Sequence, residues 1–147
     1  MGNVREDLFK LLVVVAAELD IPPIEYAFVP MIIDDSKLIL KPKGIILINE
    51  KFKDNFLEAA KCLVHEMRHA YQIYYVATKT DKLSEIWKKE LQDARNSENI
   101  NGYFVQQIEL DAFAFTQHYL RQLDYEFKYK NTTLQKLVEK YISEHFI

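Results

Sequence analysis

Residues 59–77 limit the fold more than any other part of the chain, because helical apolar spacing and reactive side chains coincide there (AAKCLVHEMRHAYQIYYVA). Nearly every turn carries apolar residues, which predicts a long helix over residues 56–78. A helix that is apolar on several sides is normally buried at the centre of a domain. His65, Glu66 and His69 would be buried with it, and burying such groups without partners costs on the order of several kcal/mol. The segment therefore predicts a central helix whose polar groups are satisfied by partners.

The spacing of His65, Glu66 and His69 is the HExxH pattern, which predicts a metal site. Two histidines four residues apart lie about 40° apart around a helix, so both imidazoles can reach one ion. Zinc binds neutral imidazole nitrogen, and a catalytic zinc needs a third protein ligand and a water molecule. Glu66 lies on the adjacent flank, where it can accept a proton from that water. We expect one Zn²⁺ ion with Glu66 as the catalytic residue; a hydrogen-bonded cluster without metal is the alternative.

Two carboxylates are candidates for the third metal ligand. The metzincin pattern requires glycine at position 72 and histidine at position 75, where the chain has Gln72 and Tyr75, so that class is excluded. Glu90 and Glu109 each lie on the apolar stripe of a predicted helix, 21 and 40 residues after His69. A carboxylate on a buried stripe needs a cation or hydrogen-bond donors. The apolar periodicity does not choose between the two.

The rest of the chain predicts an α+β fold with the element order α-β-β-β-α-α-α-α. The other predicted helices cover residues 3–20, 83–94, 103–123 and 132–146, and the predicted strands cover residues 24–33, 37–41 and 45–49. Asp54 or Asn55 is the expected cap of the central helix. Three short strands joined by tight turns predict a small, mostly antiparallel sheet packed on the HExxH helix. Residues 96–102 form the clearest loop, and without a linker we expect a single domain over residues 1–147.

Composition and charge exclude several functional classes. The 147 residues carry 19 basic and 22 acidic side chains, a net charge of −3 without a basic patch, which argues against nucleic acid as a partner. The apolar run at residues 8–17 has the spacing of an amphipathic helix and is too short to span a bilayer. We therefore expect neither a secretion signal nor a membrane contact. The single cysteine, Cys62, fits a cytoplasmic protein.

Three motifs of the chain occur together in one family. They are HEMRHAYQ at 65–72, ELDA at 109–112 followed by FAF at 113–115, and GIILIN at 44–49. Over roughly residues 24–123 the chain resembles the ImmA/IrrE-type zinc metallopeptidases, small members of the gluzincin group. The resemblance implies a minimal zincin-like fold in which His65, His69 and Glu109 bind zinc and Glu66 is the general base. The chain departs from the family pattern at Arg68, where glycine is frequent, and at Gln107, where glutamate is common.

The resemblance also implies an activity. It predicts a zinc metallopeptidase that hydrolyses peptide bonds of a protein substrate, such as a regulatory protein, by a zinc-bound water that Glu66 activates. The substrate would lie extended along an edge strand formed by Ile45–Asn49. Two alternatives belong to other classes: a catalytically silent zincin-fold module that binds a protein, and a helical interaction protein with an accidental HExxH sequence.

Several further side chains have open roles. Asp111 projects away from the face of Glu109, and it is either a partner that orients a metal-binding histidine or a solvated or capping residue. His118 lies almost opposite Glu109 and is expected to be a polar surface or core residue rather than a fourth ligand. Cys62 is expected to be a small buried thiol. The tyrosines are expected to pack, although one could donate to a tetrahedral intermediate; they are Tyr71, Tyr74, Tyr75, Tyr103 and Tyr119.

Overall fold

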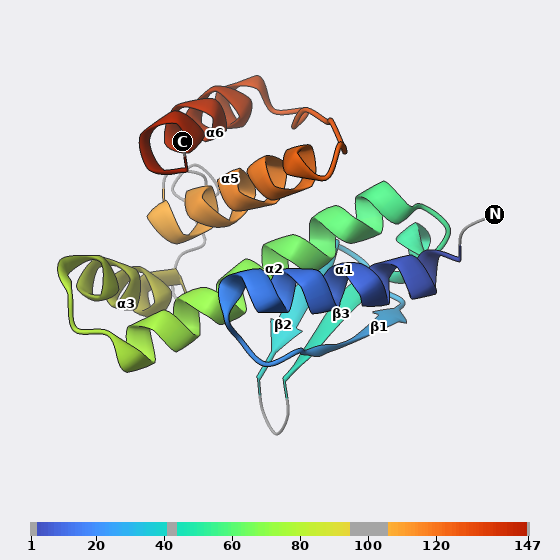
Figure 1. Cartoon of the computed structure of the whole chain (residues 1–147), viewed down its shortest axis with the longest axis horizontal. Coiled ribbons are helices and arrows are strands. Elements are labelled where there is room, and N and C mark those ends of the chain that lie inside the picture. Colours follow the sequence, from blue (N-terminus) through green and yellow to red (C-terminus); the bar gives the residue numbers. More distant parts are fainter. Residues whose placement is uncertain (1–2, 41–43, 95–105, 147) are drawn as a thin grey trace. The chain divides into compact units, whose positions relative to one another are not determined.

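The computed structural model describes residues 3–40, 44–94 and 106–146 (Figure 1). These residues form five α-helices, a three-stranded sheet and one short 3-10 helix, so the α+β class is confirmed. In chain order the elements are α1 (Val4–Leu19), β1 (Glu25–Val29), β2 (Ser36–Ile39), β3 (Ile45–Asn49), η1 (Glu50–Phe52), α2 (Phe56–Thr78), α3 (Lys82–Ala94), α5 (Gln107–Gln122) and α6 (Thr132–His145). Residues 1–71 and residues 72–147 are two compact units, and the boundary falls within α2. The single-domain organisation stays a prediction.

The helix ends follow capping residues that the sequence supplies. Asn3 caps α1 by accepting a hydrogen bond from the Arg5 amide (3.0 Å), and Asp20 ends that helix in the left-handed conformation (φ 55°). Asn55 caps α2, because its Oδ1 accepts a hydrogen bond from the Glu58 amide (3.2 Å). These caps explain why the helices begin and end where the apolar periodicity predicts.

The predicted helix bounds are confirmed for α1, α2, α3 and α6, each to within one residue at either end. The helix predicted from Tyr103 is described from Gln107 onward, as α5. Tyr103 itself and the predicted loop at 96–102 lie outside the described residues.

The three strands form a mixed sheet in the order β1-β3-β2. β3 pairs in parallel with β1, where Glu25 faces Ile45, and antiparallel with β2, where Ser36 faces Ile48. The prediction of a mostly antiparallel sheet is wrong, because the segment between β1 and β2 crosses to the other side of β3 instead of turning back. The prediction that Ile45–Asn49 is an edge strand is also wrong, since β3 is central and β2 lies at one edge.

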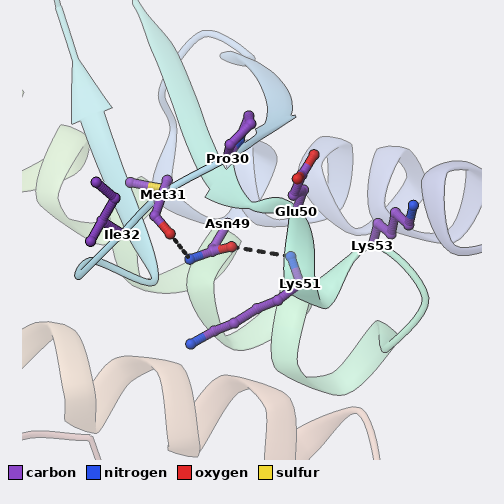
Figure 2. A pocket seen from close by; sticks show the side chains of 7 residues that line it. All are labelled: Pro30, Met31, Ile32, Asn49, Glu50, Lys51 and Lys53. Atoms are coloured by element: carbon purple, nitrogen blue, oxygen red, sulfur yellow. Dashed lines mark hydrogen bonds between the residues drawn. The ribbon is translucent and has the colours of Figure 1, made fainter.

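Asn49, the last residue of β3, holds the crossing segment in place. Its Nδ2 donates hydrogen bonds to the carbonyl oxygens of Met31 and Asp34 (3.1 Å each), and its Oδ1 accepts one from the Lys51 amide (3.1 Å). The backbone amide of Asn49 donates to the Asp35 carbonyl oxygen (2.8 Å). Figure 2 shows Asn49 between Met31 and Lys51, at an open pocket of about 460 Å³. One buried asparagine therefore fixes the segment that leads into β2.

The buried apolar residues of the first unit come from α1, β3 and the first part of α2. They are Leu8, Leu11, Leu12, Val15, Ala16, Leu19, Ile46, Ile48, Ala59, Ala60, Cys62, Leu63, Val64 and Met67, together with Ile21 just after α1. α2 is buried on several sides, as predicted: between Phe56 and Val76 only Tyr74 is exposed. No helix in the described part of the chain is both long enough and apolar enough to cross a membrane.

In the second unit α5 and α6 lie side by side (Figure 1). Their core is the buried cluster Ala114, Leu134, Val138, Tyr141 and Ile142. Asn131 caps α6, because its Oδ1 accepts a hydrogen bond from the Leu134 amide (2.9 Å). In the segment between the two helices, the Tyr129 hydroxyl donates to the Phe113 carbonyl oxygen of α5 (2.7 Å).

Replacing Asn49 by alanine removes two side-chain hydrogen bonds to the segment that precedes β2 and a third from the Lys51 amide. We expect the free energy of unfolding to fall by about 2–3 kcal/mol, since each such bond contributes about 1 kcal/mol net. The matched control is Asn131→Ala, which removes one capping bond and should cost about 1 kcal/mol. Urea unfolding measures both variants, and equal losses would contradict the role given to Asn49.

Candidate metal centre

Consecutive turns of α2 direct the His65 and His69 rings toward one another. Their Nε2 atoms are 3.1 Å apart, and the ring centroids are 4.7 Å apart with an interplanar angle of 83°. Two nitrogens bound at about 2.0–2.1 Å to one tetrahedral zinc are about 3.3 Å apart. The histidine pair therefore has nearly the spacing of two ligands to one ion.

Glu109, in the first turn of α5, completes a group of three. One ligand atom each from His65, His69 and Glu109 lies within 4.8 Å of the others, so the group could hold a metal ion. Glu109 is buried and both histidines are half-buried. A bound cation would offset the cost of burying the carboxylate. The three residues that the sequence proposes as ligands are thus brought together.

Glu90, the alternative third ligand, has a different role. Its carboxylate accepts hydrogen bonds from the amides of Gln107 (2.6 Å) and Ile108 (3.3 Å), the first two residues of α5. The residue before them, Gln106, makes no side-chain capping bond, so Glu90 satisfies amides that a helix start leaves without intrahelical partners. Among the described residues the group of candidate ligands contains Glu109 and not Glu90. The geometry favours Glu109.

Glu66, the predicted base, is bonded to the sheet. Its Oε2 accepts a hydrogen bond from the hydroxyl of Ser36 (2.9 Å), the first residue of β2. One turn earlier on α2, the Cys62 thiol donates a hydrogen bond to the Asp35 carbonyl oxygen (3.8 Å). Two consecutive turns of the HExxH helix therefore contact the start of β2.

Asp111 is buried in a hydrogen-bond network. Its Oδ2 accepts a hydrogen bond from the side-chain nitrogen of Gln72 (Nε2, 2.8 Å), and its Oδ1 accepts one from the Tyr141 hydroxyl (2.8 Å). The same Gln72 nitrogen donates to the Ile108 carbonyl oxygen (2.8 Å). The solvated interpretation of Asp111 is therefore wrong, because the side chain is 1% exposed. Its role in orienting a histidine stays a prediction.

Cys62 and His118 lie outside the group of candidate ligands. The predicted buried thiol is confirmed: burial raises the pKa of Cys62 to about 12, although a hydrogen bond from Ser36 acts in the opposite direction. His118 is half-buried and stacks on Phe146, with ring centroids 5.5 Å apart. Burial, and then the nearby Arg121 charge, lower the pKa of His118. Neither side chain belongs to the group of candidate ligands, and each has its own packing environment.

Three of the tyrosines pack against other side chains, as predicted. The Arg68 guanidinium lies 4.5 Å from the centre of the Tyr71 ring. The ring centroids of Tyr75 and Trp87 are 5.3 Å apart, and those of Tyr119 and Phe115 are 5.5 Å apart. Tyr74 is exposed, and Tyr103 lies outside the described residues.

Ser36, Gln72 and Tyr141 contact candidate site residues, but the sequence analysis did not identify them. The sequence does contain a signal that could have identified Gln72 as a site residue. It is a side-chain amide within the apolar segment 59–77, and a buried amide needs hydrogen-bond partners. Ser36 has no such signal, because it follows two aspartates in a segment typical of a turn and lies 30 residues from Glu66. Tyr141 is one apolar position among several on its helix.

No family model, curated protein or solved structure matches the chain. The resemblance to the ImmA/IrrE-type metallopeptidases therefore stays a prediction from the motifs at 65–72, 109–112 and 44–49. What supports a site is the chain's own geometry.

Alanine substitution at Glu109 and at Glu90 tests which carboxylate is the ligand. We expect Glu109→Ala to weaken zinc binding by orders of magnitude, because it removes one of three protein ligands. Glu90→Ala should leave zinc affinity within about tenfold of the wild type and lower the free energy of unfolding by about 1 kcal/mol, because α5 loses its cap. Zinc titration against a competing chelator measures both affinities. Loss of metal in Glu90→Ala with unchanged affinity in Glu109→Ala would assign the ligand to Glu90.

Proposed function

We propose that this chain is a zinc-dependent peptidase that hydrolyses peptide bonds of a protein substrate. The observation that carries the proposal is the convergence of His65, His69 and Glu109, whose ligand atoms lie within 4.8 Å of one another. Glu66 follows His65 on the same helix and is not itself in that group. A metal site with an adjacent carboxylate base supplies the two parts that hydrolysis of an amide by water needs.

The donor set fits a catalytic zinc. Two imidazole nitrogens and one carboxylate oxygen are three protein ligands, whereas a structural zinc is normally held by four. A zinc ion held by His65, His69 and Glu109 would supply a Lewis acid for the scissile carbonyl and lower the pKa of water in the site. With the Nε2 atoms 3.1 Å apart, each histidine would offer its Nε2 lone pair to the metal, which would leave the proton of each neutral ring on Nδ1.

Glu66 moves the proton in the proposed reaction. Its carboxylate accepts a proton from the attacking water, whose oxygen forms a bond to the carbonyl carbon of the substrate. The carbon–nitrogen bond then breaks, and Glu66 gives the proton to the leaving amine nitrogen. One carboxylate thus acts first as a base and then as an acid, and the proton count balances.

The substrate would lie along β2 rather than along β3. β2 pairs with β3 on one side, and among the described residues no strand pairs with its other side. Ser36 at the start of β2 is bonded to Glu66, so a peptide added as an extended strand to this edge would pass the base. Such pairing uses backbone groups, which every protein substrate has; the resemblance suggests a regulatory protein.

The proposed enzyme works in the cytoplasm. Cys62 is the single cysteine of the chain, so no intramolecular disulfide can form. Its thiol is buried, and a thiol with a raised pKa reacts slowly with oxidants. These properties suit a reducing compartment.

Replacing Glu66 by glutamine tests the chemistry. We expect Glu66→Gln to keep zinc, because Glu66 is not a ligand, and to lose turnover of unfolded casein by at least about 100-fold, because an amide cannot accept the proton. Release of peptides from fluorescently labelled casein by the untagged, zinc-loaded chain measures turnover. The matched control is Glu58→Gln, the same change on α2 at a carboxylate that pairs with Lys61 (3.1 Å).

The control should cleave casein at the wild-type rate. Equal turnover in Glu66→Gln and the wild type would show that Glu66 is not the base. A wild-type chain that holds zinc and cleaves nothing would favour the catalytically silent binding module.

A further inference from the structure

Ser36 joins the proposed substrate strand to the proposed base. Its hydroxyl donates a hydrogen bond to Glu66 Oε2 (2.9 Å), and its backbone belongs to β2, where it faces Ile48 of β3. Glu66 is buried, so this bond replaces a water contact that the carboxylate loses on burial. Oε1 takes no part in the bond with Ser36.

The backbone that precedes Ser36 is held in position by its neighbours. The carbonyl oxygen of Asp35 accepts hydrogen bonds from the Asn49 amide (2.8 Å) and from the Cys62 thiol (3.8 Å). Asn49 belongs to β3 and Cys62 to α2, so the backbone before Ser36 is fixed from the sheet and from the helix. A donor on a fixed backbone can determine the orientation of the group that it binds.

Orientation matters at Glu66 because the terminal torsion of a glutamate is broad. Rotation about this bond exchanges and tilts the two carboxylate oxygens at little energetic cost. A hydrogen bond to Oε2 restricts the rotation and leaves Oε1 as the oxygen that can receive a proton. Displacement of a reacting group by about 1 Å can cost about 100-fold in rate.

We propose that Ser36 is a positioning residue: it holds Glu66 Oε2 so that Oε1 accepts the proton of the attacking water. The inference rests on the proposed peptidase function and deepens it. Ser36 is not one of the candidate ligands, and in the proposed reaction it exchanges no proton with the water or the substrate. Its loss should therefore lower kcat while leaving KM and zinc affinity nearly unchanged.

The test compares Ser36→Thr with Ser36→Val in the full-length, zinc-loaded chain. The two substituted side chains have nearly the same shape and both suit a strand, but only threonine keeps the hydroxyl. We expect Ser36→Thr to keep kcat on labelled casein within about threefold of the wild type. Ser36→Val and Ser36→Ala should lower kcat by about 10- to 100-fold, with KM within about twofold. Zinc titration should give all three variants an affinity within about tenfold of the wild type.

Glu58→Gln is the control for a general effect of substitution, because Glu58 lies on the same helix α2, pairs with Lys61 (3.1 Å) and has no part in the proposed reaction. We expect its kcat to stay within about threefold of the wild type. Equal kcat for Ser36→Thr and Ser36→Val, or a loss in Glu58→Gln as large as that in Ser36→Val, would overturn the inference while the peptidase function stands. A zinc-loaded wild-type chain without turnover would overturn the proposed function and the inference with it.

Discussion

The structure depends on the need to give every buried carboxylate a compensating partner. Transferring a charged group out of water costs several kcal/mol, so each such group needs donors or a cation. Among the buried carboxylates, Glu66 accepts from the Ser36 hydroxyl and Asp111 from a side-chain amide and a phenol. The half-buried Glu90 accepts from two α5 amides. Glu109 instead belongs to a group with two imidazoles. Two imidazoles and a carboxylate are donors that could hold a metal ion, and this difference in partners is why we propose Glu109 rather than its neighbours as the third ligand.

The sheet is small, and its contribution to the site comes from one end of β2. The crossing segment before β2 is fixed by Asn49. Ser36, the first residue of β2, contacts the HExxH helix through its hydrogen bond to Glu66. In the proposed function, β2 would combine substrate alignment with chemistry in one element, because it has an edge available and its first residue is hydrogen-bonded to the proposed base. The mixed sheet order is what makes this arrangement accessible, since it leaves β2 rather than β3 at the edge.

Local patterns predicted the helices and the histidines, because periodicity and capping act within a few residues. α2 covers the predicted residues 56–78, and the spacing of His65 and His69 gives a pair of facing rings. Strand order was not predictable, because turn signals do not specify which strand a chain pairs with next. The Ser36–Glu66 bond joins residues 30 apart, and nothing near Ser36 in the sequence indicates it. Glu90 and Glu109 both lie on apolar stripes, so only their partners in space tell them apart.

The zinc content of the untagged chain tests the central claim most directly. After dialysis against metal-free buffer and elemental analysis, the account predicts about one zinc per folded wild-type chain. A double variant with His65→Ala and His69→Ala should hold essentially none, while its helical circular dichroism shows that the chain still folds. A folded wild-type chain that takes up no zinc when zinc is supplied, or a double variant with the wild-type zinc content, would contradict the assignment of His65, His69 and Glu109 as a metal centre.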